Sequence, residues 1–236
     1  MQHVREKSVA VVSGGEGYLG SAIGRALTEK GWKVFSLGRH AKGEDSYQCD
    51  VTSEDEVREC IERITNQHGS IRACIHAATA GLEKKPLLTL DAVSFDASLA
   101  VAVRGAFLLA KFALEHMHED SAFIGITTKL IERGVSLPPT GSYVTGKYAL
   151  RGFLRSLSVE ARPQKIRVYA VAPGFLPEGL NRDTPAPIVS LLAKKSGAGR
   201  SDVEEVAALV TRLCIERDAY PAGSSITLSP IKCDPL

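Results

Sequence analysis

The stretch Val9–Leu27, VAVVSGGEGYLGSAIGRAL, passes from apolar residues through a cluster of glycines into a segment with helical periodicity. The apolar residues that end at Ser13 have the composition of a buried strand. The apolar residues of the segment that follows fall on one helix face: Leu19, Ile23, Ala26 and Leu27. The stretch therefore predicts a strand, a tight turn and a helix, the first unit of an alternating β and α fold.

The glycines of this turn, Gly14, Gly17 and Gly20, are three residues apart. Glycine is needed where the backbone turns sharply, where it approaches a pyrophosphate, and where the helix packs on the strand. The helix N-terminus then attracts phosphates. Glycine-rich turns also occur without a ligand, but the position after a first strand favours dinucleotide binding. The predicted contact residues are Ser13, Gly14, Gly15, Gly17, Tyr18, Leu19 and Gly20.

The rest of the chain repeats the alternation of apolar strands and helical segments. Strands are predicted at SVAVVS, KVFSLG, RACIHAA, AFIGIT, IRVYAVAPG and SSITL, and helices over Leu19–Lys30, Glu54–Gln67, Ala92–Met117, Ser142–Ala161 and Asp202–Glu216. This order predicts one α/β domain over residues 1–236, with a parallel sheet covered on both faces. Gly174–Arg200, rich in Pro and Gly, follows a strand and is interpreted as a substrate loop or an ordinary surface loop.

The amino-acid composition limits which classes of binding partner are expected. The 29 Lys and Arg nearly balance the 27 Asp and Glu, and no basic run is interleaved with aromatic residues, so nucleic acid is not an expected partner. No apolar stretch is expected to reach the ~20 residues of a membrane span. Five cysteines without a C-x-x-C pair indicate neither a disulfide framework nor zinc, and favour the cytoplasm. The histidines and carboxylates of EHMHED are interpreted as a solvated helix end, so no metal is predicted.

The end of the second strand bears on the choice of cofactor. A carboxylate there binds the ribose hydroxyls of NAD, whereas an arginine accommodates the extra phosphate of NADP. Here the strand ends in Gly38, Arg39 and His40, without a carboxylate. The sequence therefore predicts NADP(H) over NAD(H), with NAD(H) still possible and Arg39 pairing with the 2'-phosphate. The alternative is that Arg39 is an ordinary surface arginine.

Tyr143 and Lys147 are four residues apart on a predicted helix, and so share one face. A phenol has a pKa near 10, and a neighbouring ammonium stabilises its anion. We expect Lys147 to lower the pKa of Tyr143. The pair can then exchange a proton with a carbonyl or an alcohol while a hydride moves to or from a nicotinamide.

With these motifs the chain resembles the short-chain dehydrogenase/reductase family over nearly its whole length. Further matching pieces are CDVTSEDEV, IRACIHAATA, VAPGF and GRSDVEEVAALVTRLC before PAGSSITL. The resemblance implies a Rossmann-type doubly wound sheet of about seven parallel strands in the order 3-2-1-4-5-6-7. It also implies NAD(P)-dependent reduction of a small carbonyl compound or oxidation of an alcohol. By position it places Asp50 and Val51 at the adenine, Ala77 and Ala78 at the ribose, and Pro173 and Gly174 at the nicotinamide.

The chain departs from the family pattern at several positions. Tyr18 stands at the middle glycine, His76 is interpreted as a structural residue at a strand end, and Ala102 replaces the asparagine of a proton relay. The serine that polarises the carbonyl is best matched by Thr128. Thr127 and Ser136 remain alternatives.

Two other readings remain open. The short connection from Arg39 to Asp50 also resembles the dihydropteridine reductases, although these favour NADH. A catalytically weak NADP-binding regulator is the second alternative. In either case, the helices Ala92–Met117 and Ser142–Ala161 are apolar almost all round, which predicts a homodimer or homotetramer.

Overall fold

The computed structural model describes residues 7–40, 43–83, 85–134, 140–228 and 231–236. Their strands form one eight-stranded sheet with the order β3-β2-β1-β4-β5-β6-β7-β8. The strands are β1 (Val9–Ser13), β2 (Lys33–Gly38), β3 (Ser46–Gln48), β4 (Ile71–His76), β5 (Met117–Ile126), β6 (Arg167–Ala172), β7 (Ser224–Thr227) and β8 (Lys232–Pro235). The predicted order of the first seven strands is therefore confirmed.

The eighth strand was not predicted. β1 to β7 pair in parallel, whereas β8 pairs antiparallel with β7, with Ser224 opposite Pro235. Only a few residues separate Thr227 from Lys232, and a parallel crossover needs a dozen or more, so the chain can return only antiparallel. KCDP carries no apolar alternation, and all four residues are exposed, so hydrophobic pattern gives no signal for this strand.

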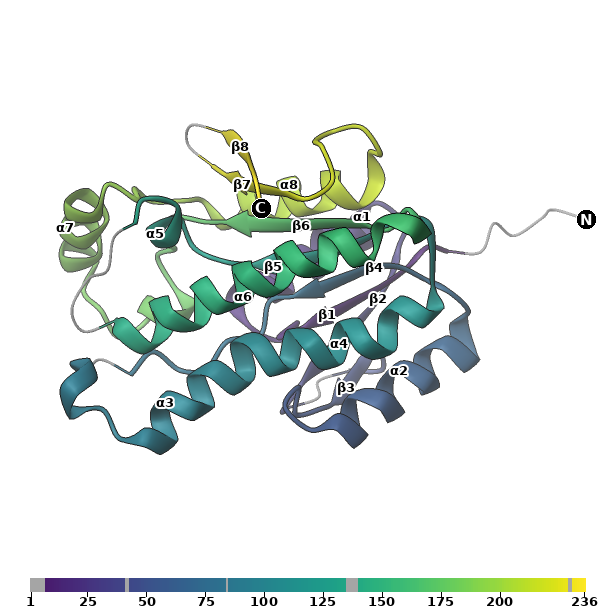
Figure 1. The fold of residues 1–236 in the computed structure, drawn as a ribbon, viewed down its shortest axis with the longest axis horizontal. Coiled ribbons are helices and arrows are strands. Elements are labelled where there is room, and N and C mark those ends of the chain that lie inside the picture. The colour runs from purple at the N-terminus through teal and green to yellow at the C-terminus, as the bar shows by residue number, and fades with distance from the viewer. Residues whose placement is uncertain (1–6, 41–42, 84, 135–139, 229–230) are drawn as a thin grey trace, which may run out of the picture.

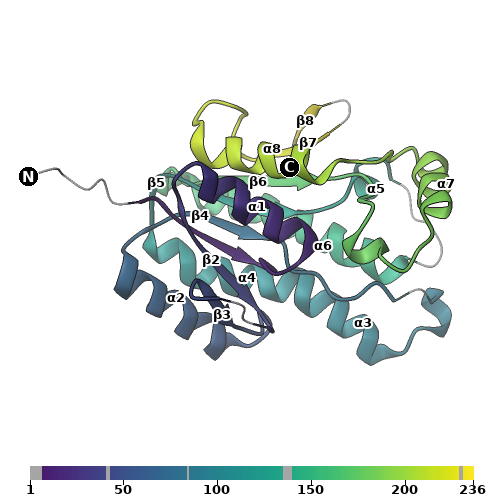
Figure 2. The ribbon, with the colours of Figure 1, turned by 180° about the vertical axis from the view of Figure 1, so that it is seen from behind.

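Helices cover both faces of the sheet. They are α1 (Tyr18–Glu29), α2 (Glu54–His68), α3 (Ala92–Leu99), α4 (Gly105–Ala113), α5 (Lys129–Glu132), α6 (Gly141–Glu160), α7 (Ala186–Ser196) and α8 (Val203–Ile215). α2, α4 and α6 cross one face, as Figure 1 shows, and α1 and α8 lie together on the other, as Figure 2 shows. Each face has its own buried cluster, built on alternate strand residues such as Val11 on one side and Val12 on the other.

The single helix predicted over Ala92–Met117 is interrupted in the structure. α3 passes into a π-helical turn, Ala100–Arg104, before α4 begins, and a 3-10 turn, Leu114–His116, ends the run. His76 Nε2 lies 3.1 Å from the carbonyl oxygen of Val101, inside the π-helical turn. The apolar periodicity carries no sign of this interruption, because the distant His76 provides the contact.

Two further expectations, one on the stretch Ala92–His116 and one on the EHMHED segment at its end, are corrected by the structure. By length and composition the stretch is apolar enough to cross a membrane, contrary to the sequence-based expectation. Helices in the core of soluble proteins pass the same test, and α4 packs on β4 and β5 here. The EHMHED segment is not a helix end throughout, because β5 begins at Met117, five residues before the predicted strand.

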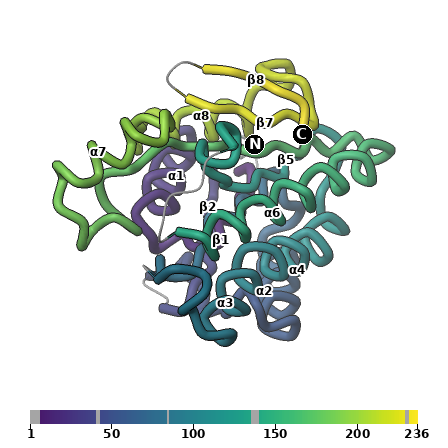
Figure 3. The backbone as a smooth tube through the Cα atoms, turned by 60° about the vertical axis from the view of Figure 1, so that its left-hand side comes forward, coloured from purple at the N-terminus to yellow at the C-terminus, as the bar shows by residue number. Residues whose placement is uncertain are grey.

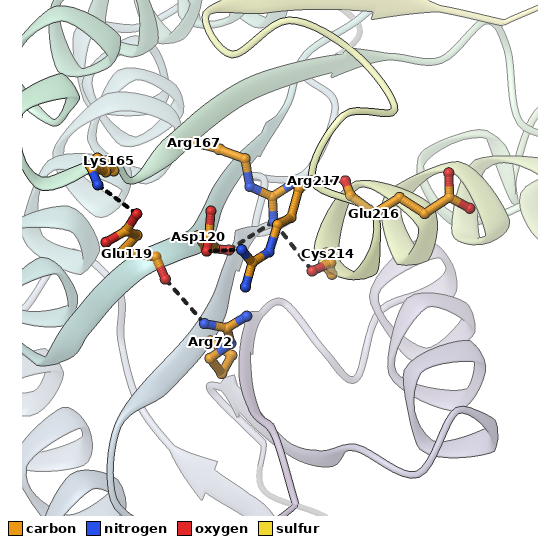
Figure 4. Close-up of polar contacts among 8 residues, drawn as sticks. All are labelled: Arg72, Glu119, Asp120, Lys165, Arg167, Cys214, Glu216 and Arg217. Atoms are coloured by element: carbon orange, nitrogen blue, oxygen red, sulfur yellow. Dashed lines mark hydrogen bonds and ion pairs between the residues drawn. The ribbon is translucent and has the colours of Figure 1, made fainter.

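The two edges of the sheet differ in what surrounds them. Beyond the carboxyl ends of the strands, at the left of Figure 1, α3 and α7 extend away from the sheet; Figure 3 looks toward this edge. At the amino edge, Arg167 at the start of β6 donates to the carbonyls of Leu213, Glu216, Asp120 and Cys214. Figure 4 shows Arg167 reaching from its strand to the end of α8. Arg167 therefore ties the last turn of α8 to β5 and β6.

Candidate active site

Gly14, Gly15 and Gly20, in and next to the turn between β1 and α1, have no room for a side chain. Gly14 has a positive φ of 69°, and a Cβ on it would lie 2.8 Å from the backbone of Ala78. A Cβ on Gly15 would collide with the Ser36 side chain of β2, and one on Gly20 with the carbonyl oxygen of Gly14. The turn is thus pressed against β2, β4 and its own helix, as a backbone cradle for a ligand requires.

The N-terminus of α1 is left open. Gly17, its N-cap, provides no side-chain bond, and the first turn has no acidic residue. In contrast, Ser53 caps α2 and Asp202 caps α8, and both helices carry acidic residues in their first turn. Free N–H groups and the helix dipole at α1 attract an anion. The cradle and the open helix end together fit the pyrophosphate of a dinucleotide.

Ser13 and His76 form a buried pair below this turn. The Ser13 Oγ and His76 Nδ1 atoms are 2.9 Å apart, and neither side chain is exposed. Because the Val101 carbonyl can only accept, Nε2 carries the proton and Nδ1 accepts from Ser13. Burial, with Lys147 as the second cause, lowers the pKa of His76 to about 3. His76 is therefore a neutral structural residue, and the Ser13 hydroxyl is held away from any ligand.

Tyr143 and Lys147 both lie on α6, and Thr128 lies across from them at the end of β5. The Thr128 side chain lies near enough to the Tyr143 phenol to act on its pKa. Burial, the larger cause, raises the pKa of Tyr143, and Thr128 acts in the opposite direction. The expectation that Lys147 lowers the pKa of Tyr143 is therefore wrong for this arrangement. The phenol stays protonated at neutral pH and is able to donate a proton.

Lys147 lies behind the phenol. Its Nζ donates to the carbonyl oxygen of Ile126 at 2.7 Å and lies 5.7 Å from the centroid of the Tyr143 ring. Burial lowers the pKa of Lys147 to about 8, so the amine is mostly protonated at neutral pH. The bond to Ile126 draws the ammonium toward β5, and this explains why it does not act on the Tyr143 hydroxyl.

One cavity of about 330 Å³ joins the glycine turn to Tyr143. Eleven of the predicted site residues line it: Gly14, Gly17, Tyr18, Leu19, Gly20, Ala77, Thr128, Tyr143, Lys147, Pro173 and Gly174. They come from the ends of β1, β4, β5 and β6 and from the starts of α1 and α6. The glycine turn and the Tyr143 phenol therefore line one continuous space.

The other predicted residues do not line this cavity. Ser13 bonds to His76, Gly15 of the turn packs against Ser36, and the Ala78 backbone packs against Gly14. Gly38 and Arg39 lie at the end of β2. The Asp50 carboxylate accepts from the backbone and hydroxyl of Thr52, and Val51 is buried. The Val51 side chain packs on α4, because a Cβ on Gly105 of that helix would lie 2.9 Å from it.

Thr128 and the two alternatives for the hydroxyl that polarises the carbonyl, Thr127 and Ser136, differ in their positions relative to the cavity. Thr127 is buried, and its hydroxyl donates to the Val171 carbonyl of β6 at 3.2 Å, away from the cavity. Ser136 lies outside the described residues. Thr128 lines the cavity and also caps α5 by accepting from the Leu130 N–H, which holds its hydroxyl in place.

The predicted substrate loop contributes to the cavity, but only in part. Leu176 and Leu180 line it, whereas Ile188 and Leu191 of α7 are exposed and do not. Sequence reasoning missed further lining residues, including Leu82, Leu130, Thr140, Phe175, Glu178 and Arg182. No spacing rule marks them, because their positions depend on how the loops at this edge close over the strands.

Comparison with known proteins agrees with this geometry. The family model described as enoyl-(acyl carrier protein) reductase matches residues 19–229. The chain belongs to the short-chain dehydrogenase/reductase family.

Two curated members of the short-chain dehydrogenase/reductase family illustrate the relationship. Cis-4-hydroxycyclohexanecarboxylate dehydrogenase of Sinomonas cyclohexanicum is 28% identical over 235 residues, which cover 93% of this chain and 94% of that protein. Short-chain dehydrogenase reductase 5 of Arabidopsis thaliana is 30% identical over 73% of this chain and 71% of its own. Among solved structures, a Burkholderia cenocepacia short-chain dehydrogenase in complex with NADP superposes with a TM-score of 0.81 at 23% identity, covering 94% and 97% of the two chains.

Proposed function

We propose that this chain is a cytoplasmic, NADP(H)-dependent oxidoreductase that reduces a small carbonyl compound or oxidises the corresponding alcohol. The observation that carries the proposal is that Tyr143 and Thr128 line one cavity together with the open glycine turn. A protein that only binds a dinucleotide has no need of a phenol held at the far end of its cavity.

A nicotinamide dinucleotide held by the glycine turn would supply the hydride to the carbonyl carbon, or accept it from the corresponding alcohol carbon. The Thr128 hydroxyl and the Tyr143 phenol both donate to the carbonyl oxygen, and Tyr143 transfers its proton to that oxygen as the alcohol forms. The raised pKa of Tyr143 keeps its proton in place until then. Lys147 stays fixed on the Ile126 carbonyl, with its Nζ 5.7 Å from the centroid of the Tyr143 ring.

The preference for NADP(H) rests on Arg39. It is exposed at the end of β2 and makes no ion pair with any residue that the structure describes. Replacing Arg39 by Ala is expected to weaken NADPH binding about tenfold and leave NADH binding unchanged, because one phosphate contact is lost. Fluorescence titration measures both constants. Arg155→Ala, an exposed arginine on α6, is the matched control, and an unchanged preference in Arg39→Ala would overturn the assignment.

The substrate follows from the cavity lining. Leu82, Leu130, Phe175, Leu176 and Leu180 make it largely apolar, which suits a compact hydrocarbon body around one reacting oxygen. The name of the Sinomonas relative adds a cyclic hydroxy acid to the compounds to be tried. A panel should therefore hold cis-4-hydroxycyclohexanecarboxylate and its ketone, simple ketones, quinones and a 3-oxoacyl thioester.

The experiment is NADPH oxidation, or NADP⁺ reduction, across this panel with wild type and Tyr143→Phe. Loss of the phenolic proton is expected to lower kcat by about 10²–10⁴-fold, with NADPH affinity retained. Tyr148→Phe is the matched control, since this tyrosine is on the same helix but donates to the Ile131 carbonyl at 3.2 Å. Equal rates for wild type and Tyr143→Phe would remove the mechanism.

A second function is favoured by one feature, the buried Ala102 in place of a polar relay side chain. Tight NADPH binding with no turnover on any substrate would identify the chain as a dinucleotide-binding regulator. The same titrations and rates thus separate the two proposals.

We also propose that the chain forms homodimers or homotetramers through α4 and α6. Phe107 on α4 and Tyr148 and Val159 on α6 are 47%, 46% and 60% exposed, on helices that already cover the sheet. Light scattering at micromolar concentration tests this, and a monomer would contradict it. Phe107→Glu is expected to dissociate the assembly.

A further inference from the structure

Glu16, the acidic residue of the glycine turn, has no part in the function proposed above. Its Oε1 atom accepts a hydrogen bond of 2.7 Å from the Ser46 hydroxyl at the start of β3. A Cβ on Gly38, the last residue of β2, would lie 3.9 Å from Glu16 Cγ. The Glu16 carboxylate is therefore held over the ends of β1 and β2 and the start of β3.

This position matters because of what a sheet with this strand order binds there. The end of the second strand receives the adenosine ribose of a dinucleotide, and a carboxylate on that strand accepts from the 2'-hydroxyl. Here the strand ends in Gly38 and Arg39, so it offers no carboxylate. Gly38 also leaves space above the strand, and the side chain that reaches this space comes from the glycine turn.

Ser46 fixes how the carboxylate is presented. It occupies one oxygen of Glu16, which leaves Oε2 to accept another hydrogen bond. β3 is held beside β2 by the pairing of Ser46 with Ser36 and of Gln48 with Gly38, so the donor is anchored in the sheet. The contact thus joins the turn to β3 across the end of β2.

We infer that Glu16 reads the 2' position of the adenosine ribose and opposes Arg39. The inference rests on the proposed dinucleotide-dependent function. The carboxylate accepts from the 2'-hydroxyl of NAD(H) and repels the 2'-phosphate of NADP(H), whereas Arg39 attracts that phosphate. Glu16 belongs to the glycine turn, with its Cγ near the Cβ position of Gly38, and Arg39 directly follows Gly38 in the chain. The preference for NADP(H) is then smaller than Arg39 alone would give.

The test is the binding of NAD⁺ and NADP⁺, which differ only at the 2' position, measured by calorimetry without substrate. Glu16→Gln is expected to tighten NADP⁺ binding about tenfold, because an exposed unit charge is removed beside a phosphate. NAD⁺ binding is expected to weaken severalfold, because an amide is a poorer acceptor than a carboxylate. The NADP⁺ gain is expected to shrink at high salt.

Two further variants separate this specific contact from general charge effects. Glu44→Gln makes the same change of charge at an exposed position in the β2–β3 connection, and is expected to leave the NADP⁺/NAD⁺ ratio nearly unchanged. Ser46→Ala keeps the charge of Glu16 but releases the carboxylate, and is expected to weaken NAD⁺ binding by a smaller factor. Glu16→Asp, with a shorter reach, is expected to weaken NAD⁺ without tightening NADP⁺.

The outcomes are distinct. A ratio shifted by Glu16→Gln and not by Glu44→Gln supports the inference. An unchanged ratio in Glu16→Gln, or equal shifts in both variants, overturns it while leaving the oxidoreductase proposal intact. If wild type binds neither NAD⁺ nor NADP⁺, the proposed function and this inference fail together.

Discussion

The polar groups at the amino ends of the strands, here called the amino edge, differ in their hydrogen bonding from those at the carboxyl ends, the carboxyl edge. At the amino edge, Arg167 is 7% exposed, and its guanidinium donates to four backbone carbonyls, as Figure 4 shows in part. At the carboxyl edge, the first turn of α1 has no side-chain cap and opens on a cavity of about 330 Å³. Two nitrogens of Arg167 bond within the chain and only its buried Nε has no partner among the described residues, whereas the first turn of α1 has N–H groups open to the cavity.

The difference separates stability from function along the length of the strands. Buried donors and acceptors that find partners within the chain stabilise the fold. Groups left open near an apolar cavity cost stability and become useful only when a ligand arrives. Substitutions at the amino edge should therefore change unfolding without changing ligand binding, whereas a substitution that occupies the open groups at the carboxyl edge should gain stability and lose ligand binding.

The largest effect is expected for Arg167→Met at the amino edge. The variant leaves several buried carbonyls without a donor, so the free energy of unfolding should fall by about 3–5 kcal/mol. Urea titration measures this loss. NADPH affinity should stay within about twofold, because Arg167 lies at the far end of β6 from the cavity.

Arg72→Met provides the control for that prediction. Arg72 also donates to a carbonyl at this edge, that of Glu119 at 3.1 Å, but the contact is exposed to solvent. Its loss should cost less than about 1 kcal/mol. If Arg72→Met and Arg167→Met destabilise equally, burial is not the reason for the role of Arg167.

Much of the carboxyl edge could be predicted from sequence because its parts are local patterns. The glycine spacing, the i, i+4 relation of Tyr143 and Lys147, and the strand order each depend on short stretches or on chain topology. The cavity that Thr128 and Tyr143 both line joins two such predictions in space. It was expected only in the sense that both residues were assigned to one site.

The parts that escaped prediction depend on contacts between distant segments. The π-helical turn at Ala100–Arg104 lies against His76, and Lys147 turns toward Ile126 because β5 passes beside it. The Arg167 network likewise joins β6 to the end of α8, 46 or more residues later. Period and composition describe one segment at a time, so they cannot register such pairings.

The second prediction concerns pH and the buried pair below the glycine turn. The unfolded chain protonates His76 near pH 6.5, whereas burial keeps the native residue neutral down to about pH 3. Between these values the unfolded state binds a proton that the native state does not. This residue should therefore lower the free energy of unfolding by about 1.4 kcal/mol for each pH unit below 6.5.

His76→Gln isolates that contribution, since an amide can still donate to Val101 but does not titrate. The variant is expected to be less stable than wild type at pH 7, and the gap should narrow by about 2–3 kcal/mol between pH 6.5 and pH 4.5. Denaturant titrations at a series of pH values measure the gap. Curves that stay parallel would show that His76 does not titrate as its burial requires.

The smallest effect on stability is expected for Gly17→Ser, which should gain stability and lose affinity for NADPH. Gly17 has the extended backbone of an N-cap, with φ −76° and ψ 167°, so a serine there gives α1 the cap it lacks. Its Cβ would lie 3.1 Å from the Gly14 carbonyl oxygen, a close contact that Gly17→Ala reproduces without the hydroxyl. Relative to Gly17→Ala, the serine variant should be about 1 kcal/mol more stable.

The serine variant should also bind NADPH severalfold more weakly than Gly17→Ala, because the new hydroxyl competes with the pyrophosphate for the same N–H groups. Thermal unfolding and fluorescence titration give both numbers. A serine variant that gains stability with no loss of affinity would mean that the open end of α1 is not where the dinucleotide is held.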